Sequence, residues 1–139
     1  MKKEEGRAVI DTNLLIRFLT EDDPEKAKAV EALLGKAGKG EIKILIPSVV
    51  IAELVWVLKS FYEMKTAEIC ELVGAVLNTP GLDTQDKSIL REALRTFESK
   101  GIDFIDAWIL EFARDRNIKM IYTFDKKHFK DIDIKMASP

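Results

Sequence analysis

Four acidic residues of this sequence stand where a carboxylate without a partner would be costly. The clearest is Glu53, whose neighbours three and four residues away along a helix are all apolar: Val49, Val50, Trp56 and Val57. Burial of a carboxylate costs several kcal/mol unless a cation, a hydrogen-bond donor or a proton compensates it. Glu53 is therefore either a hydrogen-bonded residue at the edge of the core or a ligand of a bound cation.

Asp106 repeats this arrangement in the second half of the chain. Its helical neighbours Ile102, Ile109 and Leu110 are apolar, and Asp103 lies one turn before it, so two carboxylates share an edge of one helix. A local explanation is equally good, because Asp103 suits an N-cap and Asp106 suits the first helical turn. At both positions the helix dipole favours negative charge.

Asp11 and Asp125 follow short apolar runs, "AVI" and "MIYT". Aspartate is a common cap and turn residue, which would explain either position without any chemistry. Open α/β proteins, however, bind their ligands outside the carboxyl ends of parallel strands. Two acids at strand ends and two acids on helices can therefore converge on one site.

Convergence of these acids would require a cation. Two carboxylates about 4 Å apart repel each other by about 4 kcal/mol at an effective dielectric constant near 20. An all-oxygen cluster suits Mg²⁺ or Mn²⁺, whereas one histidine and one cysteine do not make a zinc site. Such an ion polarises a phosphoryl oxygen and lowers the pKa of a bound water. The acids thus predict metal-dependent hydrolysis of a phosphodiester bond.

The elements that must hold these acids are short apolar strands that alternate with helices. We expect a strand ending at Ile10 and further strands over 42–46, 82–84 and 119–123. We expect helices after Asp11, from Pro24 through Leu34, and over 49–62 with Ser48 as cap, 66–77, 86–98 and 104–116. This alternation predicts an α/β protein with a mainly parallel sheet. The length of 139 residues predicts a single domain, 1–139.

Composition excludes several classes of protein. The chain is 47% hydrophobic and 33% charged, and charges interrupt every apolar run before it reaches membrane-spanning length. No apolar stretch with a cleavage site follows the first residues, and the single cysteine, Cys70, has no partner for an internal disulfide. We therefore expect a cytoplasmic protein. A net charge of −2 leaves contact with nucleic acid to a local patch or to metal.

Four segments carry a resemblance to a known family. They are "VIDTNLLI", "PSVVIAELVWVL", "GIDFIDAWIL" and "IYTFDKKHF", in this order and over nearly the whole chain. Together they resemble the PIN-domain ribonucleases of the VapC toxin type. The resemblance implies a three-layer α/β/α sandwich, endoribonuclease activity, frequent homodimerisation and a small antitoxin protein that blocks the acidic groove.

The resemblance also implies roles for individual residues. Asp11, Glu53, Asp106 and Asp125 match the catalytic acids that bind Mg²⁺ or Mn²⁺, and Asp103 matches an auxiliary acid. Three further residues match the polar positions that support the acids: Thr12, Asn13 and Thr123.

Basic and aromatic residues near these motifs have two interpretations. Arg17 lies one helical turn after Asn13, and Lys126 directly follows Asp125, so both are candidates for contact with RNA phosphates. Either could equally be an ordinary solvated charge. Trp56 and Trp108 lie in apolar helical patterns and are expected in the core or at a dimer interface.

Two other functions compete with the nuclease interpretation. The chain could be an RNA-binding or assembly module that keeps the fold without catalysis, although all four acids are present. It could also be a receiver domain that is phosphorylated on an acid after the first strand. Such a domain is expected to have a further acid near that position, whereas Thr12 and Asn13 follow Asp11 here.

Overall fold

The computed structural model of this protein describes residues 6–125 and 133–139, which fall into two compact units, Met1–Lys87 and Ser88–Pro139. Each unit is described by itself. The proposed phosphate contact Lys126 lies outside the described residues.

The first unit contains a parallel sheet whose central strand is buried. Its strands are β1 (Arg7–Val9), β2 (Lys43–Ile46) and β3 (Leu82–Thr84), in the order β1-β2-β3. Ala8 pairs with Ile44, and Ile44 pairs in turn with Leu82. Because both neighbours of β2 run in the same direction, all three carboxyl ends lie at one edge of the sheet. That is the edge at which ligands bind in α/β proteins.

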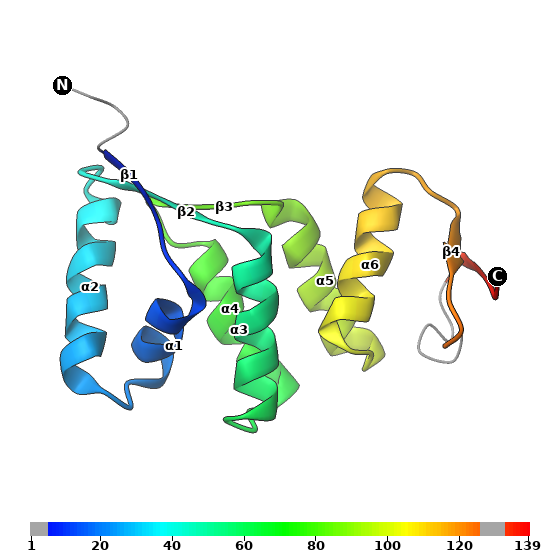
Figure 1. The fold of residues 1–139 in the computed structure, drawn as a ribbon, viewed down its shortest axis with the longest axis horizontal. Helices are drawn as coiled ribbons and strands as arrows, with labels where there is room; N and C mark the ends of the chain where they lie inside the picture. The colour runs from blue at the N-terminus through cyan, green and yellow to red at the C-terminus, as the bar shows by residue number, and fades with distance from the viewer. Residues whose placement is uncertain (1–5, 126–132) are drawn as a thin grey trace. The chain divides into compact units, whose positions relative to one another are not determined.

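Four helices accompany this sheet: α1 (Thr12–Thr20), α2 (Pro24–Gly38), α3 (Ser48–Ser60) and α4 (Thr66–Leu77). Helix α1 packs against α2 and α3, and α3 packs against α4 (Figure 1). Helix α2 begins where its sequence predicts, because Pro24 takes the first helical position and the Asp23 carboxylate accepts a 3.2 Å hydrogen bond from the Lys26 amide.

The second unit contains the helices α5 (Lys87–Lys100) and α6 (Phe104–Asp115) and the strands β4 (Met120–Tyr122) and β5 (Lys135–Ala137). The rings of Phe97 and Phe104 join α5 to α6 edge to face, 5.9 Å between centroids. Strands β4 and β5 pair in parallel. An apolar cluster packs α6 against both strands and consists of Leu110, Ala113, Ile121, Ile134 and Met136.

The six helices and parallel strands of the described residues confirm the predicted α/β class. The predicted helix over 66–77 and the strand over 82–84 have the bounds of α4 and β3. Strand β5 was not predicted, because its three residues show no alternation of apolar and polar positions. In the described part of the chain, no helix has the length and apolarity that a bilayer crossing demands.

One local prediction about α3 is wrong, and another is narrowed. Ser48 is not its cap: the N-cap is Pro47, and both the amide and the hydroxyl of Ser48 donate to Oε1 of Gln85, at 3.0 and 3.3 Å. Of the two positions expected for Trp56, the core of its unit is excluded, because 65% of the residue is exposed; the dimer interface stays a prediction. Helix α3 is apolar on two faces, and only the face with Ile51, Leu54 and Leu58 is buried.

Candidate active site

Asp11 lies at the carboxyl end of β1, where the chain turns into α1. It is the N-cap of this helix in extended conformation, with φ −95° and ψ 173°. Its Oδ1 atom accepts a 3.1 Å hydrogen bond from the backbone amide of Asn13. The simple interpretation of Asp11 as a cap is therefore correct, and the bond engages one carboxylate oxygen. The side chain is exposed, and its other oxygen, Oδ2, takes no part in that hydrogen bond.

Glu53 is held by Thr12, the residue that follows Asp11 in the chain. The Thr12 side chain is buried, with 6% of the residue exposed, and its hydroxyl donates a short hydrogen bond to Oε1 of Glu53. This contact joins the first turn of α1 to the middle of α3. Glu53 on α3 is thus tied to the residue that follows Asp11 at the end of β1.

Glu53 is not buried, and its hydrogen bond from Thr12 agrees with the interpretation of this residue as a hydrogen-bonded glutamate at the edge of the core. Glu53 is exposed, and its neighbours Val49 and Trp56 are 70% and 65% exposed. Val50, another apolar neighbour of Glu53, is buried, so the apolar pattern around Glu53 indicates core only in part. The exposure of Glu53 removes the desolvation cost and leaves a carboxylate that is reachable from solvent and oriented by Thr12.

Asp103 and Asp106 lie together at the start of α6. Asp103 is the N-cap residue, and its carbonyl oxygen accepts a 2.9 Å hydrogen bond from the amide of Ala107. Asp106 is in the first turn and half-buried. Negatively charged side chains are common in the first turn of a helix, because the N-terminus carries a partial positive charge.

Asp125 follows β4 and is exposed. Its backbone amide donates a 3.0 Å hydrogen bond to Oγ1 of Thr123, whose own amide donates to the carbonyl of Ala137 at 2.9 Å. Thr123 thus ties the segment of Asp125 to β5. Helix α6 and strand β4 run in opposite directions (Figure 1), so the first turn of α6 and the end of β4 lie at the same end of this unit.

Arg17 forms an ion pair with Asp22, which lies just after the end of α1. Its Nη1 atom lies 3.2 Å from Oδ1 of Asp22, and Oδ2 of the same carboxylate accepts a 2.7 Å hydrogen bond from the hydroxyl of Tyr62. The bond from Tyr62, together with Arg17, holds the pKa of Asp22 below its ordinary value. A second polar link therefore joins the end of α1 to the residues just after α3.

The structure thus gathers Asp11, Thr12, Asn13 and Glu53 in the first unit. Asp103, Asp106, Thr123 and Asp125 lie toward one end of the second. Within either unit, the described residues include no three His, Cys, Asp or Glu side chains grouped to hold a metal ion. The donors present are carboxylates, which are the ligands that Mg²⁺ and Mn²⁺ prefer, so the donor chemistry fits the predicted ion.

Comparison with known proteins assigns the chain to a family. A model of the PIN domain matches residues 8–135, which include every acid described above. The chain belongs to the PIN domain family. It is also 28% identical over 131 residues to the VapC ribonuclease of Aquifex aeolicus (strain VF5), an alignment that covers 94% of this chain and 96% of that protein. These findings confirm the resemblance that the four sequence segments predicted.

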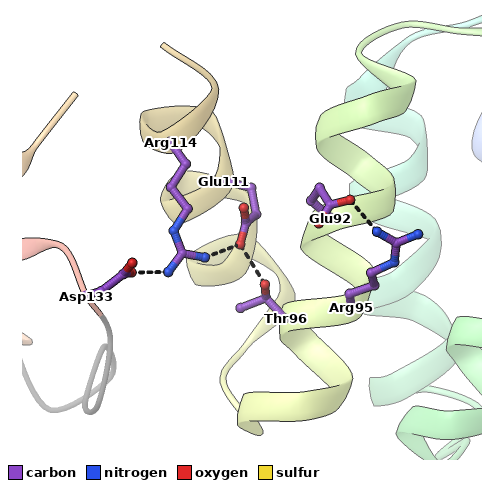
Figure 2. A network of polar contacts seen from close by, with 6 residues as sticks. All are labelled: Glu92, Arg95, Thr96, Glu111, Arg114 and Asp133. Atoms are coloured by element: carbon purple, nitrogen blue, oxygen red, sulfur yellow. Dashed lines mark hydrogen bonds and ion pairs between the residues drawn. The ribbon is translucent and has the colours of Figure 1, made fainter. Parts of the chain in front are cut away.

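Sequence reasoning missed a polar network in the second unit of this PIN domain. Glu111, with 7% of the residue exposed, accepts hydrogen bonds on Oε2 from the hydroxyl of Thr96 and from Nη1 of Arg114, at 2.6 and 2.8 Å. Arg114 also contacts the carboxylate of Asp133 through Nη2 (Figure 2). The signal for an internal pair was present, since an acid and an arginine three residues apart share one face of a helix.

Proposed function

We propose that this PIN-domain protein is an endoribonuclease that hydrolyses RNA phosphodiester bonds with Mg²⁺ or Mn²⁺. The observation that carries the proposal is the hydrogen bond to Glu53 from Thr12, the residue that follows Asp11 at the carboxyl end of β1. The match to the PIN family over residues 8–135 and the similarity to a VapC ribonuclease support it.

The acids proposed as catalytic and as metal ligands are Asp11, Glu53, Asp106 and Asp125, with Asp103 as an auxiliary ligand. A divalent ion held by these carboxylates supplies charge that polarises the phosphoryl group and favours deprotonation of the attacking water. The carboxylates would also exclude a second anion from the site until the ion offsets their charge. RNA phosphate and metal are therefore expected to bind together.

The supporting residues of this chain orient the acids before substrate arrives. The amide of Asn13 holds one oxygen of Asp11, and the hydroxyl of Thr12 holds one oxygen of Glu53. Preorganised ligands of this kind need no rearrangement when the ion binds. Arg17 and Lys126 are proposed phosphate contacts. For Arg17, this role would be shared with its ion pair to Asp22.

We further propose that the protein is the toxin of a type II toxin–antitoxin pair, that it acts in the cytoplasm as a homodimer, and that a small antitoxin protein blocks its acidic groove. Support comes from the VapC ribonuclease of Aquifex aeolicus, which aligns with 94% of this chain. The whole chain, 1–139, would act as one nuclease domain.

The test is cleavage of RNA by the purified protein in Mg²⁺, in Mn²⁺ and in EDTA. Asp11→Asn, Glu53→Gln and Asp106→Asn are expected to reduce kcat by about 100-fold or more, since even second-layer partners of metal ligands cost 10- to 100-fold. The matched control is Glu71→Gln, which removes the charge of an exposed acid on α4 and is expected to keep full activity.

A second measurement separates this proposal from its main alternative. Binding of Mn²⁺ to the protein, followed by electron paramagnetic resonance, should weaken in the same three acid variants. A protein that binds RNA but neither cleaves it nor takes up a divalent ion would be a non-catalytic assembly module instead. Full cleavage by Asp11→Asn or Asp106→Asn would show that the assigned mechanism is wrong.

A further inference from the structure

Strand β5 and the residues just before it depend on a small number of contacts. β5 pairs with β4 over three residues, from Met120 with Lys135 to Tyr122 with Ala137. A short two-stranded ladder is marginally stable without further packing. The additional contacts made by this segment are therefore expected to decide where the ladder lies.

Two contacts anchor the segment to α6. Ile134 enters the apolar cluster with Leu110 and Ala113, and Asp133 pairs with Nη2 of Arg114. The hydrogen bond from Arg114 holds the pKa of Asp133 below its ordinary value, so this carboxylate is ionised at neutral pH. Apolar packing of Ile134 holds β5 against α6, and the directional bond from Arg114 to Asp133 fixes the position of β5 along α6.

Arg114 is itself held in place from the other side. Its Nη1 atom donates to Glu111, whose same oxygen accepts the hydroxyl of Thr96 on α5 (Figure 2). Burial disfavours the charge of Arg114, but the bonds to Asp133 and Glu111 outweigh it and raise the pKa of the guanidinium. The guanidinium is thus a fixed bridge between a buried carboxylate on α6 and the start of β5.

The other end of β5 reaches a proposed catalytic acid. The carbonyl of Ala137 accepts the amide of Thr123, and the hydroxyl of Thr123 accepts the amide of Asp125. A displacement of β5 is therefore passed through two hydrogen bonds to Asp125.

We propose that Arg114 is a positioning residue for Asp125, which it holds in place through Asp133, β5 and Thr123. The role of Asp125 rests on the proposed nuclease function, whereas the mechanical link rests on the contacts alone. Displacement of a reacting group by about 1 Å can cost about 100-fold in rate. A contact remote from the acid can therefore affect turnover strongly.

Asp133→Asn is the sharpest variant, because it weakens the bridge to a hydrogen bond with a neutral acceptor while Glu111 keeps its cation. Asp133 is also exposed, so the substitution should leave the overall fold intact. The matched control is Glu92→Gln, which removes the carboxylate of the 2.5 Å pair between Glu92 and Arg95 within α5 (Figure 2). Asp133→Glu keeps the charge and serves as the rescue variant.

The first readout requires no activity. In Asp133→Asn, amide hydrogen exchange at Thr123 and Lys135 is expected to accelerate about tenfold through local opening, and the amide resonance of Asp125 should shift. Glu92→Gln and Asp133→Glu should match the wild type at all three residues. Unchanged exchange and an unchanged Asp125 resonance in Asp133→Asn would overturn the inference.

The second readout is steady-state cleavage of RNA. Asp133→Asn is expected to lower kcat about tenfold with KM changed less than about twofold, and Asp133→Glu should restore kcat. Faster exchange without loss of kcat would also overturn the inference, since β5 would then not position a catalytic group. If the wild type cleaves no RNA, the proposed function fails, and the exchange and resonance data still decide whether Arg114 holds Asp125.

Discussion

At the scale of single residues, Thr12 is the residue on which the first half of the site depends. It follows the cap residue Asp11, its side chain is buried, and its hydroxyl meets the carboxylate of Glu53. A hydroxyl is needed here because Glu53 is exposed and would otherwise sample many rotamers. The bond restricts the carboxylate to one place, and that would lower the entropy cost of binding the proposed metal ion.

Thr12→Val should therefore reduce function more than stability. We expect kcat for RNA cleavage and affinity for Mn²⁺ to fall about tenfold, whereas the free energy of unfolding should fall by about 1 kcal/mol. Kinetics, metal titration and urea unfolding measure the three quantities. Thr12→Ser keeps the hydroxyl and should stay within a fewfold of the wild type. Equal activity of the valine and serine variants would contradict the role given to Thr12.

At the scale of elements, the position of β3 depends on a close approach to the end of α2. Gly81 precedes β3 with φ +86°, in the left-handed region that favours glycine. A Cβ atom at this position would lie 2.3 Å from the carbonyl oxygen of Ala37, which belongs to α2. The carbonyl of Gly81 also accepts the amide of Ile44 at 3.1 Å, and this bond continues the pairing of β2 with β3.

Gly81→Ala should destabilise the protein by about 3 kcal/mol, because the backbone conformation and the contact with Ala37 are both unfavourable for a side chain. Gly74→Ala on α4 is the control. Its Cβ would meet nothing within 4 Å, so it should stabilise the helix by about 0.5–1 kcal/mol. Urea unfolding of the two variants measures these opposite effects. Equal stability of both variants would show that the approach of α2 to β3 is not tight.

At the scale of the whole molecule, the proposed acids are distributed over the length of the chain. Asp11 and Glu53 belong to the unit Met1–Lys87, and Asp106 and Asp125 belong to Ser88–Pro139. The family match covers residues 8–135 and so includes acids of both units. Because the proposed function depends on acids of both units, removal of any one should abolish most of the activity.

The double variant Asp11→Asn/Asp106→Asn tests whether acids of the two units act together in catalysis. Residues that act as one catalytic unit show strongly non-additive losses. We expect the double variant to lose no more than about threefold beyond the worse single variant. A loss equal to the product of the two single losses would indicate that the acids act independently. Single-turnover rates at saturating Mg²⁺ are the measurement.

The sequence by itself determined the class of fold, the order of most elements and the family. These features depend on local patterns: the caps Asp11 and Asp23, the proline at the start of α2, and apolar periodicity such as that of α4. The four segments around the acids are likewise contiguous, so they can be recognised without any knowledge of contacts.

Only the tertiary structure decided how the site residues are held. It placed Glu53 on the exposed face of α3, against the hydroxyl of Thr12, and it joined Arg114 to Asp133 across 19 positions of the chain. A helix that is apolar on two faces does not reveal which face packs inward, because both satisfy the same periodicity. Hydrogen bonds between distant residues depend on how elements pack, and no local pattern encodes that.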